Sequence, residues 1–314
     1  MTFKVKTSLL AAGMGVALLA SAGAHAQTVK LMTGPQGGSW YPLGGAIANF
    51  AGKDGMKVQV LPGAGIANVK AVQAGKADMG FANSISTVDG VAGRAPFTEK
   101  ATNVCNVATL YPQYFQIVAN ADAGIETLAD TKGKSIAVQP KGNTAEFISQ
   151  QILGVYGLKY EDMGKVSYVS YTDAVSLMKD NNAQLFTLGT TVPASAIMDL
   201  ASARDIKLVS VGDDKFAEMR KLNPGYTKLT IKAGSYPKQD KDVQAVGYAT
   251  HVIARCDLDE ETVYKMAKGL ADNNADLTSI VRVMKDTDLK VMATDTGVPM
   301  HKGAVKFYKE KGVM

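Results

Sequence analysis

The order of apolar segments and polar turns is the feature that most limits how this chain can fold. Strand-like segments alternate with helix-like segments in the first part of the chain, at residues 29–33, 42–53, 58–61, 66–74 and 78–82. Between residues 166 and 191 the same order of strand, helix, polar turn and strand returns. Such alternation predicts βαβ units and a mainly parallel sheet. Its recurrence predicts two α/β domains of similar construction.

The chain should cross between these domains twice. A proline that follows an apolar strand near Leu110–Pro112 favours the first crossing there, and the second is expected after Val211. We therefore expect domain 1 to comprise residues 27–110 plus 216–314, and domain 2 residues 111–215. In open α/β sheets, ligands bind at the carboxyl ends of the strands, and helix N-termini at those ends suit anions. A ligand cleft between the two domains is the expectation.

The first 26 residues have the pattern of a secretory signal peptide. Lys4 and Lys6 supply a positive start, residues 9–20 are apolar, and Ala24-His25-Ala26 fits the small-residue cleavage rule. The apolar run is shorter than the roughly 20 residues that a membrane-spanning helix needs. The alternative is a retained N-terminal helix. We expect cleavage after Ala26 and a mature protein in the periplasm.

Charge excludes one class of partner. The full chain of 314 residues carries 34 Lys and Arg against 29 Asp and Glu, a formal charge of +5. Loss of residues 1–26 removes two lysines and no acid, which leaves 288 residues with a charge of +3. These charges are spread along the chain without a basic run, so a nucleic-acid partner is not expected.

Two segments resemble enzyme motifs, but each lacks a glycine that the motif requires. Gly133-Lys134-Ser135 ends like a phosphate-binding loop, but Leu128 stands where the first glycine belongs. A dinucleotide fingerprint would need a third glycine at Asn68. After residue 26 the chain has two histidines, His251 and His301, with no carboxylate at ligand spacing. We therefore predict no enzyme activity, no metal and no cofactor.

Two turns carry groups suited to a small ligand. Residues 37–41, Gly-Gly-Ser-Trp-Tyr, place a hydroxyl, an indole N–H and a phenol in a strand-to-helix turn. The alternative is that Trp40 packs in the core. Residues 141–144, Lys-Gly-Asn-Thr, open a helix and could form an anion-binding nest, with ordinary N-capping by Asn143 or Thr144 as the compatible alternative.

Several stretches together make the chain resemble the TAXI subfamily of TRAP-transporter solute-binding proteins along essentially its whole mature length. Their order and spacing carry the resemblance. They are TGPQGGSWYPLGGAIA (33–48), GKADMGFAN (75–83), ATLYPQYFQIVA (108–119), GIETLADTKGKSIAV (124–138), GSYPKQDKDV (234–243) and VPMHKGAVKFYKEKG (298–312).

The resemblance implies a two-domain clamshell of the periplasmic-binding-protein type, similar to type II, that closes over its ligand. By matching motif positions, the expected cleft residues are Ser39, Trp40, Tyr41, Gly65, Asn83, Ser84, Tyr111, Asn143, Thr144 and Thr187. None of the five arginines after residue 26 lies in these motifs. A carboxylate would then be held by backbone N–H groups, hydroxyls and amides.

The function that the resemblance implies is capture of a small organic anion, such as glutamate, glutamine or 2-oxoglutarate. The protein, a monomer, would deliver this anion to TRAP membrane permease subunits driven by an ion gradient. The alternative is an extracytoplasmic ligand sensor that feeds a signalling receptor. The sequence does not separate the two.

The two cysteines, Cys105 and Cys256, allow a disulfide in an oxidising compartment. The alternative is a pair of buried free thiols. Cys105 begins the strand that runs to the first crossing, and Cys256 follows the strand 248–254. If those strands are antiparallel neighbours, the cysteines meet, and on that condition we predict the bond.

Overall fold

The computed structural model describes residues 1–2, 28–35 and 38–314. The predicted signal peptide and its cleavage site fall almost entirely in residues 3–27, outside the described residues. None of the helices that the described residues form has the length and hydrophobicity needed to span a lipid bilayer.

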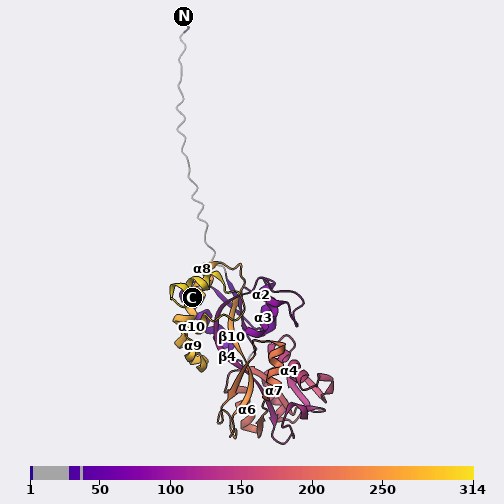
Figure 1. Ribbon diagram of the computed structural model, residues 1–314. Coiled ribbons are helices and arrows are strands. Elements are labelled where there is room, and N and C mark those ends of the chain that lie inside the picture. Colours follow the sequence, from indigo (N-terminus) through magenta and orange to yellow (C-terminus); the bar gives the residue numbers. More distant parts are fainter. Residues whose placement is uncertain (3–27, 36–37) are drawn as a thin grey trace.

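Two α/β lobes share one ten-stranded sheet (Figure 1). The strands are β1 (Val29–Met32), β2 (Val58–Leu61), β3 (Met79–Asn83), β4 (Cys105–Asn120), β5 (Ser135–Val138), β6 (Lys165–Tyr168), β7 (Leu185–Thr190), β8 (Ile206–Leu208), β9 (Thr227–Ile231) and β10 (Val243–Ala254).

Helices connect these strands and cover the sheet. The α-helices are α1 (Trp40–Lys53), α2 (Gly65–Gln73), α3 (Ser84–Ala92), α4 (Thr144–Val155), α5 (Tyr171–Lys179), α6 (Ser195–Ala203), α7 (Asp213–Leu222), α8 (Glu260–Asp272), α9 (Asn274–Ile280), α10 (Leu289–Met292) and α11 (Lys302–Glu310). Short 3₁₀ turns are η1 (Leu128–Thr131), η2 (Tyr160–Asp162) and η3 (Arg282–Asp286).

The strand order shows the repeat that the sequence predicts. The main path is β2-β1-β3-β10-β4-β7-β5-β6. On each side, the first strand of the lobe lies in the middle of a parallel trio, β2-β1-β3 in one lobe and β6-β5-β7 in the other. The sheet as a whole is mixed, because β10 runs antiparallel to both β3 and β4, and β4 runs antiparallel to β7. Two lobes built alike therefore meet on the long strands β4 and β10.

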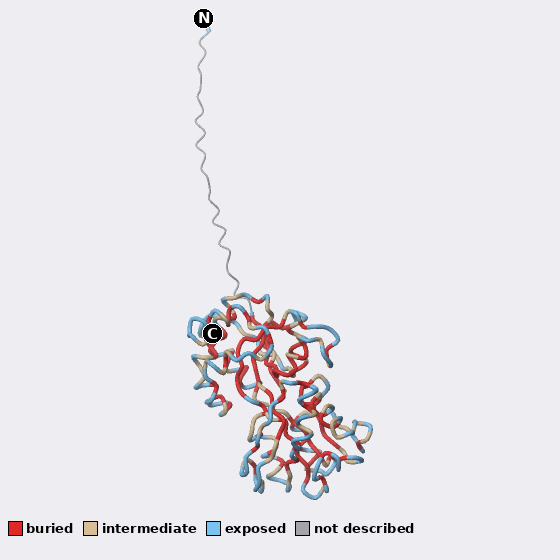
Figure 2. Tube along the Cα trace, viewed as in Figure 1, coloured by how far each residue is buried: buried red, intermediate tan, exposed pale blue. Residues whose placement is uncertain are grey.

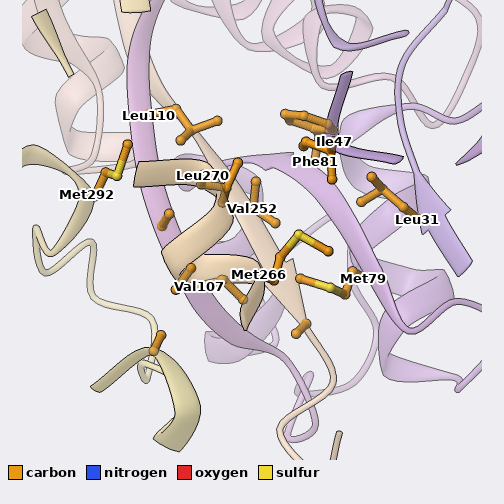
Figure 3. Close-up of a cluster of buried hydrophobic side chains, with 14 of the residues drawn as sticks. Leu31, Ile47, Met79, Phe81, Val107, Leu110, Val252, Met266, Leu270 and Met292 are labelled. Carbon is orange, nitrogen blue, oxygen red and sulfur yellow. The ribbon is translucent and has the colours of Figure 1, made fainter. Parts of the chain in front are cut away.

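The core of the first lobe lies between the sheet and helices from both ends of the chain. Leu31 and Phe81 of the sheet are fully buried beside Ile47 of α1, and Met266 and Leu270 of α8 belong to the same cluster. Figure 3 shows these side chains gathered around β4 and β10. The C-terminal helices thus complete a core that the N-terminal strands begin.

The second lobe buries both faces of its part of the sheet, as the buried trace through it in Figure 2 shows. One cluster contains Ile148 of α4 and Met219 of α7, and the other contains Met178 of α5 and Ile197 of α6. Five of the six residues of β7 are buried, as expected for a strand that is covered on both faces.

The lobes change over within β4 and β10. The side chain of Tyr111 packs in the first core, whereas Phe115 packs in the second, so β4 crosses near Pro112. The return crossing is later than expected. Residues 216–314 were assigned to the first domain, but α7 packs against α4, and Ile231 and Ala245 belong to a core of the second lobe. Residues up to about the middle of β10 therefore belong to the second lobe. Figure 1 shows α7 beside α4.

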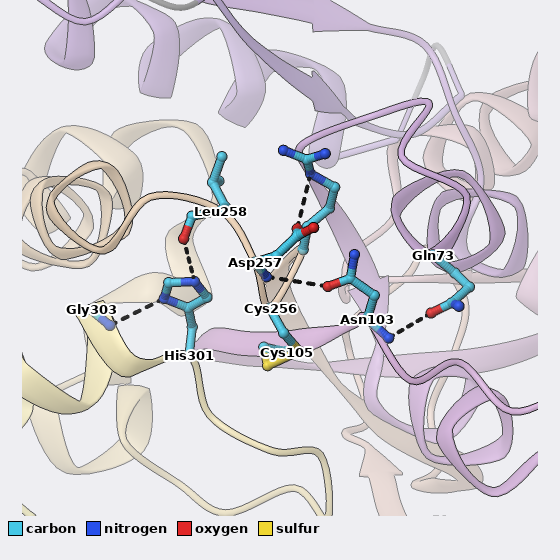
Figure 4. The surroundings of a disulfide bond; sticks show 9 residues. Gln73, Asn103, Cys105, Cys256, Asp257, Leu258, His301 and Gly303 are labelled. Carbon is cyan, nitrogen blue, oxygen red and sulfur yellow. Dashed lines mark hydrogen bonds and ion pairs between the residues drawn. A yellow bond between two sulfur atoms is a disulfide. The ribbon is translucent and has the colours of Figure 1, made fainter.

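A disulfide joins β4 to the segment after β10. Ala254 pairs with Cys105 across the two antiparallel strands, which is the strand adjacency that the disulfide hypothesis required. The sulfur atoms of Cys105 and Cys256 are bonded, with their Cα atoms 5.1 Å apart (Figure 4). Both cysteines lie in the first lobe, so the bond leaves the movement of one lobe against the other free.

Candidate functional site

A small cavity lies where the lobes meet. Its lining comes from both lobes and from the shared strands: Gly34, Pro35, Gly38, Ser39, Trp40, Gly65, Asn83, Gln113, Asn143, Tyr171, Gly189, Thr190 and Tyr248. The cavity has a volume of about 30 Å³. A site needs roughly 10–15 Å³ to hold one water, so this space holds about two.

Helix N-termini line this cavity. The lining contains the N-cap or the first residue of five helices, α1 to α5. The reason is the strand order: each helix follows a parallel strand and so begins at the carboxyl end of the sheet. The first-turn N–H groups of a helix lack partners within the helix and carry its positive dipole end. The cavity therefore favours negative charge.

Capping differs between the lobes. Asn143 caps α4, because its Oδ1 accepts a hydrogen bond from the Ala145 N–H at 2.8 Å. In the first lobe no side chain caps the starts of α1, α2 or α3 by a hydrogen bond. The Asn83 side chain has the position of a cap but does not act as one, and its Oδ1 is buried without a partner among the described residues. An incoming solute can hydrogen-bond to the groups left open there.

Five of the ten residues predicted from the sequence line the cavity. They are Ser39, Trp40, Gly65, Asn83 and Asn143. Trp40 packs in the core and also forms part of the cavity wall: its indole is 6% exposed and stacks on Phe81 with ring centroids 5.7 Å apart.

The other five lie outside the lining. Tyr41 is 42% exposed on α1. Tyr111 is buried and its hydroxyl lies 2.8 Å from Ser39 Oγ, so it supports a lining residue. The hydroxyl of Ser84 accepts from the Ala249 N–H.

Thr144 and Thr187 have structural partners instead. Thr144 Oγ1 lies 2.8 Å from Ser86 Oγ, a contact between lobes. Thr187 Oγ1 lies 2.8 Å from Ser149 Oγ within the second lobe, and Thr187 is not among the residues that line the cavity.

Gln113 is the most connected lining residue that the motifs did not indicate. Gln113 lies on β4 and is 3% exposed. In one orientation of its side-chain amide, both the oxygen and the nitrogen have hydrogen-bond partners. The oxygen then accepts from Trp40 Nε1 at 2.8 Å and from Thr250 Oγ1 at 2.6 Å, and the nitrogen donates to the Gly189 carbonyl at 3.0 Å. Gln113 thus connects both lobes at the floor of the cavity. A glutamine within the apolar run of β4 was the available signal.

Two tyrosines complete the wall from the side of the second lobe. The Tyr171 hydroxyl donates to the Gly189 carbonyl at 3.0 Å. Burial raises the pKa of Tyr171 and of Tyr248 above the usual phenol value, so both are neutral. A Cβ at Gly189 would lie 2.0 Å from the Tyr248 hydroxyl, which explains why glycine is required there.

The described lining contains no charged side chain. Lys141, the nearest cation by sequence, is exposed and its Nζ lies 5.2 Å from the centre of the Tyr168 ring. Among the described residues no cluster of three or more His, Cys, Asp or Glu could hold a metal ion. The histidines lie elsewhere: His251 Nε2 is 2.7 Å from Thr87 Oγ1, and His301 caps α11.

The lobes touch around the cavity. Besides the contact between Thr144 and Ser86, the Ala67 N–H donates to the Gly142 carbonyl at 3.2 Å. Asn223 Nδ2 donates to Asp89 Oδ2 at 2.9 Å. These bonds hold the two lobes together around the cavity.

Comparison with known proteins agrees with this architecture. A family model, the NMT1-like family, matches residues 31–312. PhnD1 from Prochlorococcus marinus MIT 9301, in complex with methylphosphonate, has a TM-score of 0.55 at 10% identity, with 91% of this chain and 99% of that chain covered. An ancestral arginine-binding protein bound to arginine has a TM-score of 0.50 at 18% identity, with 84% and 99% covered. The expected fold class, a two-domain α/β clamshell of the periplasmic-binding-protein type, is confirmed.

Proposed function

Because the chain belongs to the NMT1-like family and has the two-domain periplasmic-binding-protein fold, we propose that it is an exported solute-binding protein that captures a small carboxylate. It passes this solute to a membrane permease, of the TRAP type that its TAXI-like motifs indicate. Export rests on the signal-peptide pattern of residues 1–26.

One observation carries the choice of an anion: helix starts from both lobes line a cavity that contains no charged side chain among its described residues. A cation there would face the positive ends of helices with no acidic group to balance it. A carboxylate would accept hydrogen bonds from first-turn N–H groups and from the Ser39 hydroxyl.

Neutral donors also suit a protein that must release its solute. A buried ion pair would be strongly destabilised when one partner leaves, because an uncompensated charge remains. Helix N-termini and amides keep no net charge after release. Binding and release are then governed by closure and opening of the lobes.

The test starts from the solute that the protein carries. The mature chain is purified and denatured, and the released small molecules are identified by mass spectrometry. The stripped, refolded protein is then screened by thermal shift against amino acids, keto acids, dicarboxylates, sugars and polyamines. Since a ligand that binds only the folded state raises Tm, carboxylates should give the largest shifts. Shifts from sugars or polyamines alone would refute the proposal.

A further inference from the structure

A second and larger cavity opens beside the first, and no motif in the sequence indicates it. It has a volume of about 410 Å³. Four parts of the chain form it: the start of α1 with the turn before it, Tyr171 at the start of α5, the segment 188–196 that ends β7 and begins α6, and residues 280–283 at the end of α9 and just after it. We call it the outer cleft. Its walls come from both lobes, as do those of the small cavity.

The two spaces are neighbours and share part of their walls. Gly38, Ser39, Tyr171 and Thr190 line both. The first cavity has room for about two waters, which is about the space that the two oxygens of one carboxylate fill. Any solute whose carboxylate is held there must therefore place its remaining atoms in the outer cleft.

Aliphatic side chains and prolines make up just over half of the lining of the outer cleft, and Ser39, Tyr171, Thr190, Thr191 and Ser195 add hydroxyl groups. Nine of its lining residues are aliphatic or proline: Pro42, Leu188, Val192, Pro193, Ala194, Ala196, Ile280, Val281 and Val283. Arg282 is the charged residue in the described lining, and it is exposed. Ile280 is 39% exposed, an apolar side chain left in contact with water. Burying these aliphatic surfaces against hydrocarbon is favourable.

We propose that the outer cleft binds the apolar chain of the solute, so that the ligand class is a monocarboxylate carrying several carbon atoms rather than a small amino acid or keto acid. This inference rests on the proposed function, because the carboxylate end is held by the helix starts of the first cavity. The cleft lies between lobes that close on each other, so closure would bury the chain from both sides.

The test measures binding of acetate, butanoate, hexanoate and octanoate to the ligand-stripped full mature chain by calorimetry. Each methylene that enters the outer cleft should tighten binding roughly fourfold, until the cleft is full. Adipate matches hexanoate in length and ends in a second carboxylate, so it should bind more weakly than hexanoate. Affinity that is flat along the series, or adipate binding better than hexanoate, would overturn the assignment.

Variants locate the effect. Ala196→Phe fills the outer cleft and should weaken octanoate binding about tenfold or more, while acetate stays within about twofold. Ala203→Phe makes the same change on the exposed far end of α6 and should alter neither affinity. Ile280→Ser, at a partly exposed position, should weaken octanoate binding and leave acetate binding unchanged.

The outcomes separate the two proposals. If short and long carboxylates bind equally and Ala196→Phe changes nothing, the chain-binding role of the outer cleft is wrong and the carboxylate site stands. If no carboxylate of any length binds, while a sugar or polyamine does, both are wrong.

Discussion

Gly65 of the first lobe faces Thr144 of the second so closely that no side chain fits between them. A Cβ atom at Gly65 would lie 2.1 Å from Thr144 Oγ1 and 2.9 Å from Asn83 Nδ2. Gly65 begins α2 and Thr144 begins α4, so this contact joins two helix starts at the wall of the small cavity. The closed arrangement of the lobes depends on a glycine here.

Gly65→Ala should therefore oppose closure. Overpacking of this kind costs about 1–3 kcal/mol, and a cost paid only in the closed state weakens ligand binding about tenfold or more. Calorimetry with the carboxylate that gives the largest thermal shift measures the affinity. Small-angle scattering of the variant should show a larger radius of gyration than that of the wild type.

The matched control is Gly52→Ala, near the end of α1, where an added Cβ would meet nothing within 4 Å. Alanine is a better helix former than glycine, so this variant should keep its affinity and gain at most about 1 kcal/mol of stability. Equal affinities for Gly65→Ala and wild type would show that closure does not need the contact.

Gln113→Met tests the hydrogen bonds at the floor of the cavity. Methionine keeps the length of the side chain but removes the amide oxygen that accepts from the Trp40 N–H and the Thr250 hydroxyl, whereas the Gly189 carbonyl keeps the Tyr171 hydroxyl as a donor. An unsatisfied buried polar group costs about 1–3 kcal/mol, so the free energy of unfolding should fall by at least that amount. Urea denaturation followed by Trp40 emission measures it, since Trp40 is the one tryptophan in the chain.

Gln59→Met on β2 is the comparison, because Gln59 is exposed and should change stability by less than about 0.5 kcal/mol. A Gln113→Met variant as stable as the Gln59→Met variant would mean that the Gln113 amide makes no net contribution to the free energy of unfolding.

Local patterns in the sequence predict most of this fold, because each parallel strand and each following helix has its own periodicity. The long strand β4 is the exception. Pro112 was expected to interrupt it, yet the strand continues through this residue. Proline is tolerated where a strand pairing is irregular, and the register between β4 and β10 shifts directly beside the Pro112–Ala249 pair. That irregularity depends on a partner strand 137 positions away, between Pro112 and Ala249, and no local pattern announces it.

The residues that line the small cavity also fall into some that local sequence patterns predict and others that they do not. Ser39, Gly65 and Asn83 stand at strand-to-helix turns, where sequence motifs are informative. Gly189 and Tyr248 reach the cavity from β7 and β10, and only the way in which the lobes meet brings them there. The position of α7 and β9 in the second lobe was missed for a related reason, since both are placed by contacts with distant elements.

The disulfide should be formed in every molecule of the oxidised protein and should stabilise the first lobe. The oxidised protein, denatured without reductant, should show no reactive thiol, and after reduction it should show both cysteines. Cys105→Ser/Cys256→Ser should lower the free energy of unfolding by up to roughly 5 kcal/mol, because the bond closes a loop of 151 residues in the unfolded chain. Ligand affinity should stay unchanged, since neither cysteine lines the cavity. Two reactive thiols in the unreduced protein would contradict the bond.

His251 should make stability depend on pH. It lies on β10, fully buried, and burial lowers its pKa from about 6.5 to about 3. Thr87 Oγ1 donates to the Asn83 carbonyl, so the His251 ring donates from Nε2 to Thr87, and Nδ1 is left buried without a partner among the described residues. A proton on Nδ1 would have no acceptor there. The folded state therefore holds the ring neutral.

The sign follows from the two pKa values. As the pH falls below about 6.5, the unfolded chain binds the proton while the folded chain does not, so stability is complete above that pH and is lost between about 6.5 and 3. Between pH 7.5 and 4.5 the loss from this residue should be about 3 kcal/mol, because pH 4.5 lies two units below the unfolded pKa and each unit corresponds to 1.36 kcal/mol. Urea denaturation of wild type and His251→Gln at both pH values measures it. His301, whose pKa burial also lowers, is present in both proteins, so the difference between their pH dependences isolates His251. If the variant loses as much stability as the wild type over this range, the titration of His251 is not the cause.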